Sequence, residues 1–437
     1  MLNHKEIKDL RTKHLGPSLS LSYDEPLQIV RGKGQYLYDA DGNQYLDCIN
    51  NIQHVGHCHP KVVTAAQKQY TQLNTNTRYL GETIVKYAKN LTDTLPTGLE
   101  VCFFTNSGSE ANDLALRMAR QYTRSKETIV LDGAYHGNLL SLIEISPYKH
   151  DAPGGSGAPD FVYTLPMPDP FRGKYRGEDC GEQYAQEVQT VISEIQNKGN
   201  KVSTFIVEAL MGCGGQLILP KGFLKKAFDL VSAAGGVCIV DEIQIGFGRV
   251  GSHFWGFETH GVAPDIVTMG KSMGNGHPLS AVVTTQEIAD AFNNGMEYFN
   301  SFGGNPVSCA VGRAVLNVIK EEKLQENARV VGSYLLEQLI TLKSKNDLIG
   351  DVRGKGLFIG IELVKDRDTL KPAAVEANQI INRMKEKGIL SSTDGPDHNV
   401  IKVKPPMVFN KQNVEILTSV LDETLEEIKK GDIRKPL

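Results

Sequence analysis

The segment VCIVDEIQIGFGR, residues 237–249, begins as an apolar strand pattern and then changes abruptly to two adjacent carboxylates. A short apolar run rich in β-branched residues is typical of a strand that is covered on both faces. Asp241 and Glu242 follow it directly. A carboxylate at the end of a buried strand needs a facing cation, so the segment predicts either a structural ion pair or a bound, positively charged group.

Strand-length apolar runs recur on both sides of this segment, and longer patterns of helical period separate them. Such alternation predicts an α/β domain with a mostly parallel sheet, whose ligands gather beyond the carboxyl ends of the strands. The runs are VCFF, TIVL, STFIV, GVCIV, DIVTM and AVVTT, and the intervening helices are expected at Glu110–Tyr122, Gln183–Ile195 and Lys221–Ala234.

A second, α+β pattern begins after Gly304 and predicts a smaller domain, which strands near 27–30 and 35–39 are expected to join. The domains are therefore placed at 1–55 (an N-terminal segment of the small domain), 56–315 (the large domain) and 316–437 (the C-terminal small domain). The region from Ser146 to Cys180 is predicted to be irregular and to cross the surface or the mouth of the site. The other expected elements are helices over 306–340, 373–387 and 411–429 and strands in IGDVRG, LFIGIELV and VIKV.

Composition argues against several classes of protein. The chain has 437 residues and a net charge of -4, which gives no basic footprint for nucleic acid. It has no apolar run near the roughly 20 residues of a membrane helix and no secretory signal at its start, so a cytoplasmic location is expected. Seven scattered cysteines predict reduced thiols. Cys58 in GHCHP lacks a second ligand cluster, so a turn and no metal are expected.

Two segments that follow predicted strands could hold the parts of a ligand. TNSGSEAND, residues 105–113, leads into a helix, where Ser107, Gly108 and Ser109 would meet a phosphate or simply form an N-cap. In LDGAYHGN, residues 131–138, Tyr135 precedes His136 at a strand end. Such an aromatic residue stacks on a planar ligand or packs on the core.

A third segment, PDIVTMGKSMGNGHP at residues 264–278, places Lys271 among glycines at a strand end. A lysine in a confined site can act as nucleophile and base, whereas an isolated lysine is more commonly a solvated surface group. A phosphate cradle, a stacking aromatic, a carboxylate for a pyridine nitrogen and a lysine for an aldehyde together match pyridoxal phosphate. The chain has no strand–GxGxxG–helix layout and no GxxxxGK[ST], which disfavours dinucleotide and P-loop sites.

The motifs GHCHP, TNSGSEAND, AYHG, DEIQIGFGR, MGKSMGNGHP and FGGNP resemble, in order, those of the class III, fold-type I aminotransferase family. The resemblance covers nearly the whole chain. It implies a seven-stranded type of mostly parallel sheet, pyridoxal phosphate as cofactor, and a homodimer with shared active sites. Lys271 would bind the cofactor as a Schiff base and Asp241 would pair with its ring nitrogen. The other cofactor residues implied are Ser107, Gly108 and Ser109 at the phosphate, Tyr135 and Ile243 on the two ring faces, Gln244 near the ring hydroxyl, His136, Glu208, and Ser301 at the neighbouring subunit's phosphate.

Within the family, LDCINNIQHVGHCHP, LNTNTRYL and IKVKPPM resemble the ethanolamine-phosphate and phosphohydroxylysine phospho-lyases. Lys402 stands where many relatives have an arginine that grips a carboxylate, and Cys213 stands where some have the glutamate that masks this arginine. These departures favour a substrate that has a phosphate and no α-carboxylate. The expected substrate residues are Asn50, Asn51, Arg78, Lys402 and Lys404.

The function predicted from this resemblance is elimination of phosphate from a small phosphorylated amine. Phosphoethanolamine would give acetaldehyde, ammonia and phosphate, and 5-phosphohydroxylysine stays open as a second substrate. The alternative enzyme is an ω-aminotransferase that passes an amine to a keto acid. A non-catalytic binding or scaffold protein is disfavoured because both Lys271 and Asp241 are present.

Overall fold

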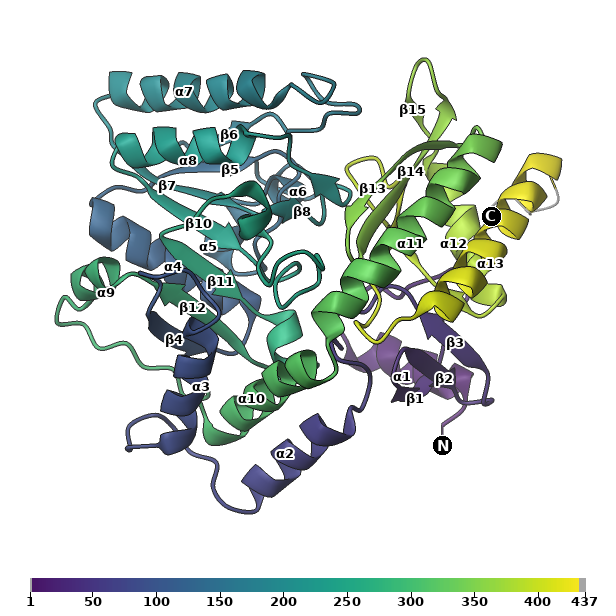
Figure 1. Ribbon diagram of the computed structural model, residues 1–437, viewed down its shortest axis with the longest axis horizontal. Helices are drawn as coiled ribbons and strands as arrows, with labels where there is room; N and C mark the ends of the chain where they lie inside the picture. Colours follow the sequence, from purple (N-terminus) through teal and green to yellow (C-terminus); the bar gives the residue numbers. More distant parts are fainter. Residues whose placement is uncertain (1, 432–437) are drawn as a thin grey trace.

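The computed structural model describes residues 2–431, and a seven-stranded sheet of order β4-β12-β11-β10-β7-β5-β6 lies at its centre (Figure 1). Only β12 runs antiparallel to its neighbours. The predicted α/β class with a mostly parallel sheet is therefore confirmed. The strands are β4 (Val101–Thr105), β5 (Glu127–Leu131), β6 (Val162–Leu165), β7 (Val202–Val207), β10 (Val237–Asp241), β11 (Ile266–Met269) and β12 (Ser280–Thr284).

Helices cover both faces of this sheet, which explains why its strands are continuous apolar runs. Ile239 of β10 packs in the cluster that contains the buried face of α4 (Gly108–Thr123). Its neighbours Cys238 and Val240 point the other way, into the cluster that contains α7 and α8. The two layers are visible on opposite sides of the sheet in Figure 1. The covering helices on that second face are α7 (Gly181–Asn197) and α8 (Phe223–Ala233).

The N-terminal and C-terminal parts of the chain share a second group of sheets, at the right of Figure 1. One sheet has the order β1-β2-β3-β16, in which Ile389 and Leu390 of β16 pair in parallel with Leu46 and Asp47 of β3. The other has the antiparallel order β13-β14-β18-β17, with β15 paired to β14. These strands are β1 (Ile29–Lys33), β2 (Tyr36–Asp39), β3 (Gln44–Asp47), β13 (Ile349–Lys355), β14 (Phe358–Asp366), β15 (Lys371–Pro372), β16 (Ile389–Leu390), β17 (Ser392–Asp394) and β18 (Val400–Val403).

The remaining helices frame these sheets. Helix α10 packs against α2 and α3 beside the large sheet, and α11 packs against β13 and α13. None of the helices within residues 2–431 has the length and apolar character needed to span a bilayer. The elements are α1 (His4–His14), α2 (Pro60–Tyr70), α3 (Glu82–Thr92), α5 (Leu140–Ile143), α6 (Pro147–His150), α9 (Gln286–Phe292), α10 (Pro306–Glu321), α11 (Leu324–Lys345), α12 (Ala374–Glu386), α13 (Lys411–Lys430), the 3-10 turns η1 (Phe257–His260) and η2 (Lys271–Gly274), and the short strands β8 (Leu210–Met211) and β9 (Leu217–Ile218).

The region 146–180 is not wholly irregular, because it contains α6 and the edge strand β6. The four-residue run VYTL was too short, between proline-rich flanks, to stand out as a strand. The proposed boundary at residue 315 lies inside the unbroken helix α10, so the domain limits stay a prediction.

Candidate active site

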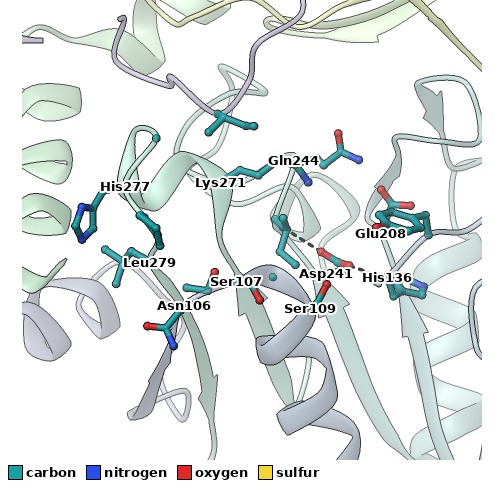
Figure 2. Close-up of a pocket in the computed structure, with 18 residues that line it drawn as sticks. Asn106, Ser107, Ser109, His136, Glu208, Asp241, Gln244, Lys271, His277 and Leu279 are labelled. Atoms are coloured by element: carbon teal, nitrogen blue, oxygen red, sulfur yellow. Dashed lines mark hydrogen bonds and ion pairs between the residues drawn. The ribbon is translucent and has the colours of Figure 1, made fainter. Parts of the chain in front are cut away.

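A cavity of about 360 Å³ lies at the carboxyl ends of the large sheet (Figure 2). Its walls come from the segments that follow β4, β5, β7, β10 and β11, as expected for an open α/β sheet. Ten residues expected from the sequence line it: Ser107, Gly108, Ser109, Tyr135, His136, Glu208, Asp241, Ile243, Gln244 and Lys271. The sequence reasoning missed the other lining residues: Ile52, Asn106, Gly137, Gly276, His277, Pro278, Leu279 and Ser280.

The start of α4 forms a polar floor that includes the N-cap of the helix and suits an anion. Ser107 Oγ accepts a hydrogen bond from Glu110 N at 3.2 Å, and Ser109 Oγ accepts one from Asn138 N at 3.0 Å. Both hydroxyls therefore keep their own protons for a further acceptor. The N–H groups at this helix start carry the positive end of the helix dipole, so the cavity floor suits a phosphate.

Gly108 is required for close packing at this floor. A Cβ built on Gly108 would lie 2.5 Å from Ile243 Cδ1, a distance that real Cβ atoms do not tolerate. Ile243, which lines the cavity, would have to shift. The absence of a side chain at Gly108 therefore allows the start of α4 and Ile243 to pack closely together at the cavity wall.

Asp241 is buried at the end of β10 and is held by three protein donors. Asn112 Nδ2 donates to its Oδ2 at 2.7 Å, His136 Nδ1 lies 3.0 Å from the same oxygen, and Ile243 N donates to Oδ1 at 3.1 Å. Thr268 in turn donates to Asn112 Oδ1 at 2.6 Å. Among residues 2–431 no lysine or arginine pairs with Asp241, and the ion-pair partner that the sequence left open is there represented by His136 alone.

Sequence reasoning missed Asn112, although a signal was present. It is a polar residue on the apolar face of the helix pattern EANDLALRMAR, and it is fully buried in the structure. A buried amide on such a face is stable only when its hydrogen bonds are made. Besides Asp241, Asn112 Nδ2 also reaches His136 O at 2.7 Å, which ties the site's aspartate to the loop after β5.

Two buried carboxyls near the cavity differ in their partners. Burial, with a smaller effect from the neighbouring Asp241, raises the pKa of Glu208 to about 7. Glu208 Oε2 accepts from Gly212 N at 3.0 Å, but its Oε1 has no partner within residues 2–431. Glu242, whose pKa burial also raises to about 7, accepts from Gly256 N and Phe257 N and therefore supports the loop after β10.

Lys271 follows β11 with a backbone φ of +25°, in a region that side-chain-bearing residues sparsely populate. Such a conformation costs on the order of 1–3 kcal/mol and persists where the surrounding structure enforces it. The preceding Gly270 allows the close approach, because a Cβ there would meet Ser280 Oγ at 2.8 Å. In Figure 2 the Lys271 side chain extends through the cavity toward Gln244.

The expected substrate residues lie outside the cavity lining. Lys404 Nζ donates to Gln244 Oε1 at 2.9 Å and lies 3.5 Å from Asp394 Oδ2, and Lys402 Nζ lies 3.0 Å from Asp394 Oδ1. Asn51 Nδ2 also donates to Gln244, at 3.3 Å, whereas the backbone N of Asn50 donates to Asp47 Oδ1.

Arg78 and Ser301 lie elsewhere in this chain. Both residues are exposed, and Arg78 pairs with Glu297 at 3.0 Å and covers the ring of Phe299. A single chain therefore does not bring these two residues to its own cavity. Among residues 2–431, no three histidine, cysteine, aspartate or glutamate side chains gather as a metal site would require.

The sequence matches a family model along most of its length. The model describes class-III aminotransferases and covers residues 20–425. The chain belongs to this family. It is therefore a pyridoxal-phosphate enzyme, and the cavity fits the cofactor: the α4 start suits a phosphate, and the buried Asp241 without a cationic partner suits a protonated ring nitrogen.

Individual relatives carry two kinds of name. A Drosophila melanogaster protein named alanine–glyoxylate aminotransferase 2-like is 52% identical, over 97% of this chain and 89% of its own length. A Caenorhabditis elegans protein named ethanolamine-phosphate phospho-lyase homolog 1 is 44% identical, over 96% and 93%. Among solved structures, a phospholyase from Arthrobacter in complex with phosphoethanolamine has a TM-score of 0.92 at 40% identity, over 96% of this chain and 99% of that one.

Proposed function

We propose that this enzyme is a phospho-lyase that eliminates phosphate from a small aminoalkyl phosphate, with phosphoethanolamine as its substrate. Two relatives support this class of reaction by their names. The observation that carries the proposal is the chemistry of the cations near the cavity. No arginine lines the cavity within residues 2–431, and the cations of the adjoining strand β18 and its extension are Lys402 and Lys404. A lysine is a suitable point-charge partner for phosphate, whereas carboxylates are commonly gripped by the fork of an arginine.

We assign the cofactor contacts from the geometry of the cavity. Ser107, Gly108 and Ser109 would hold the cofactor phosphate at the start of α4. Asp241 would keep the ring nitrogen protonated, and Lys271 would bind the aldehyde. Tyr135 and Ile243 would cover the ring, with Gln244 near its hydroxyl. Hydrogen bonds from His136 and Asn112 hold the Asp241 carboxylate in place, and would keep it directed at the ring nitrogen.

The proposed reaction requires one base and one leaving-group site. When bound, pyridoxal phosphate supplies an aldehyde that captures the substrate amine and a ring that accepts electron density. The substrate amine would displace Lys271 from the aldehyde, and the freed amine of Lys271 would then take the proton from the carbon that bears the substrate amine. The electrons of that C–H bond form a C–C double bond, and those of the C–O bond leave with phosphate. With one water, phosphoethanolamine therefore gives acetaldehyde, ammonia and inorganic phosphate.

The leaving phosphate needs a cation that solvent and substrate can reach. Lys402 is the more accessible of the two lysines, since its side chain is 21% exposed and that of Lys404 is 3% exposed. Cys213 lies in the same group, because Glu208, Asp394 and both lysines influence its thiol. Burial raises the pKa of Cys213 to about 12, so its thiol is neutral at physiological pH. The two lysines therefore have no carboxylate at this position, where dual-substrate transaminases have the glutamate that masks their arginine.

We further propose a homodimer in which each chain completes its partner's site. Arg78 and Ser301 lie on two neighbouring exposed segments of this chain rather than at its own cavity. Large apolar side chains stand beside them: Tyr79, Leu80 and Phe302 are 70%, 110% and 71% exposed. A cluster of this kind is typical of a surface that another protein covers. In the dimer, Arg78 would approach the substrate phosphate and Ser301 the cofactor phosphate.

The alternative function is an ω-aminotransferase, which the name of the Drosophila relative favours. Incubation with phosphoethanolamine alone separates the two reactions. A lyase releases phosphate and acetaldehyde in equal amounts, turnover after turnover, without any keto acid. A transaminase converts its cofactor to the amine form once and then stops until a keto acid is added. Phosphate release that stays at background, with amine transfer to a keto acid intact, would exclude the lyase.

A further inference from the structure

The amide of Gln244 is held by two donors that come from distant parts of the sequence. Lys404 Nζ donates to Gln244 Oε1 at 2.9 Å and Asn51 Nδ2 donates to the same oxygen at 3.3 Å. A carbonyl oxygen has two lone pairs, so these two contacts use its acceptor capacity. Within the described part of the chain, Gln244 Nε2 has no hydrogen-bond partner, although the residue lines the cavity. The amide cannot turn over without losing both contacts, so its N–H groups remain free for a ligand.

Lys404 is an unusual residue to find in this position. It is 2% exposed, and a buried ammonium is stable only with charge compensation and hydrogen bonds. The charged or titratable groups that face it are Asp394, Lys402, Cys213, Lys271 and Glu208. Burial lowers the pKa of Lys404 to about 8, and Asp394 opposes this effect, so the ammonium form persists at neutral pH.

The position of this charge has a direct effect on the amide. An ammonium 2.9 Å from Oε1 draws electron density toward that oxygen and makes the amide N–H groups stronger donors. Because Lys404 is buried, its charge is screened less than a surface charge would be. Lys404 therefore both orients Gln244 and polarises it.

We propose that Lys404 is a positioning residue for the cofactor: it directs and polarises Gln244, whose N–H groups then stabilise negative charge on the ring oxygen of pyridoxal phosphate. This role replaces substrate-phosphate binding as the function of Lys404 and leaves that task to Lys402 and Arg78. The inference rests on the proposed placement of Gln244 at the ring oxygen. It does not depend on whether the enzyme is a lyase or a transaminase.

The test uses the visible absorbance of the substrate-free holoenzyme, titrated with pH. A donor to the ring oxygen stabilises the negative charge that remains when the bound cofactor loses its own proton. Lys404→Met should therefore raise the pH midpoint of the absorbance change by about one unit, a tenfold change in proton affinity. Lys404→Arg keeps the charge and the donors and should restore most of the wild-type midpoint. A midpoint in Lys404→Met equal to that of the wild type would overturn the proposal.

Lys402→Met is the matched control, because Lys402 shares the partner Asp394 and the adjacent strand but does not contact Gln244. It should leave the pH midpoint nearly unchanged. An equal shift in Lys402→Met and Lys404→Met would mean that the loss of one positive charge, and not the contact with Gln244, causes the shift. Gln244→Leu should shift the midpoint upward, and adding Lys404→Met to it should change nothing more. Additive shifts would contradict a role of Lys404 through Gln244. An unchanged midpoint in Gln244→Leu would show that Gln244 does not contact the ring oxygen.

Asn51→Ala tests the same role if Lys404→Met fails to fold. Asn51→Ala removes the second donor to Gln244 Oε1 without touching the buried lysine. The amide then keeps only one restraint, so the midpoint should rise by a smaller amount than in Gln244→Leu. A wild-type midpoint in Asn51→Ala, together with an insoluble Lys404→Met, would count against the orienting role.

Discussion

At the scale of single residues, the cavity wall contains buried carboxyl groups that water cannot solvate. Glu208 is the clearest case, because one of its carboxyl oxygens has no partner within residues 2–431. Burial favours its neutral form, which explains the raised pKa of about 7. The proton on Glu208 also limits repulsion with Asp241, whose carboxylate must remain negative if it is to balance a ring nitrogen.

The Glu208 carboxyl should make the stability of the apoprotein depend on pH. Its folded-state pKa lies above the ordinary value of 4.5, so its stabilising contribution is complete below pH 4.5 and is lost as pH rises through about 7. Glu208→Gln stays neutral throughout. Relative to the wild type, this variant should therefore gain thermal stability between pH 5 and pH 8, as measured by calorimetry on apoprotein.

The matched control for this prediction is Glu194→Gln on the exposed side of α7, where Glu194 pairs only with Lys198. Surface pairs of this kind contribute little to stability, so the difference from the wild type should not change with pH. A pH-independent difference for Glu208→Gln would show that its carboxyl is ionised in the folded protein as readily as in the unfolded chain.

At the scale of elements, the start of α4 combines a helix cap, a phosphate-sized floor and a close contact with the loop after β10. Ser107 is the N-cap of the helix, and Asn112 one turn later holds Asp241. One helix therefore positions the residues proposed for the phosphate and for the ring nitrogen of the cofactor. The packing of this helix on β7, β10, β11 and β12 fixes the distance between them.

Gly108→Ala should weaken cofactor binding much more than it weakens the fold. The new Cβ would lie 2.5 Å from Ile243 Cδ1, so Ile243, which lines the cavity, would have to shift. We expect the dissociation constant of pyridoxal phosphate to rise by roughly tenfold or more, since about 1.4 kcal/mol corresponds to a factor of ten. Titration of apoprotein with the cofactor, followed by absorbance, measures this change.

Gly16→Ala provides the comparison, because a Cβ at Gly16 meets nothing closer than 3.9 Å. Its cofactor affinity should equal that of the wild type. If Gly108→Ala binds the cofactor with wild-type affinity, Ile243 does not border the ring.

At the scale of the whole molecule, the proposed dimer makes a quantitative prediction for mixed subunits. Lys271→Ala removes a residue of one chain's cavity, whereas Arg78→Ala removes a residue that would act in the partner's site. Random reassociation of the two inactive variants gives about half mixed dimers, each with one intact site. Lyase activity should therefore recover to about a quarter of the wild-type value, measured as phosphate release.

Mixing Lys271→Ala with Asp241→Asn is the matched control, because both residues lie in the same chain's cavity. Mixed dimers of this pair have two defective sites, so no activity should return. If the mixture of Lys271→Ala and Arg78→Ala also stays inactive while mixed dimers form, Arg78 does not act across the subunit interface.

The sequence by itself determined the α/β class, the parallel strands and most of the cavity wall. These follow from local patterns, since apolar runs of strand length alternate with helical periods, and since strand ends in a parallel sheet face one ligand site. Ser107, Asp241 and Lys271 each stand directly beside such a run, which made them visible without coordinates.

Only the tertiary structure decided which partners surround these residues. Asn112, Asp394 and Lys404 are far from Asp241 and Gln244 in sequence, and no local pattern predicts a hydrogen bond between side chains on different elements. The packing of α4 on the sheet brings Asn112 to Asp241, and the placement of β18 and the residues after it brings Lys404 to Gln244. These contacts exist because buried polar groups must find partners wherever the fold happens to bring them together.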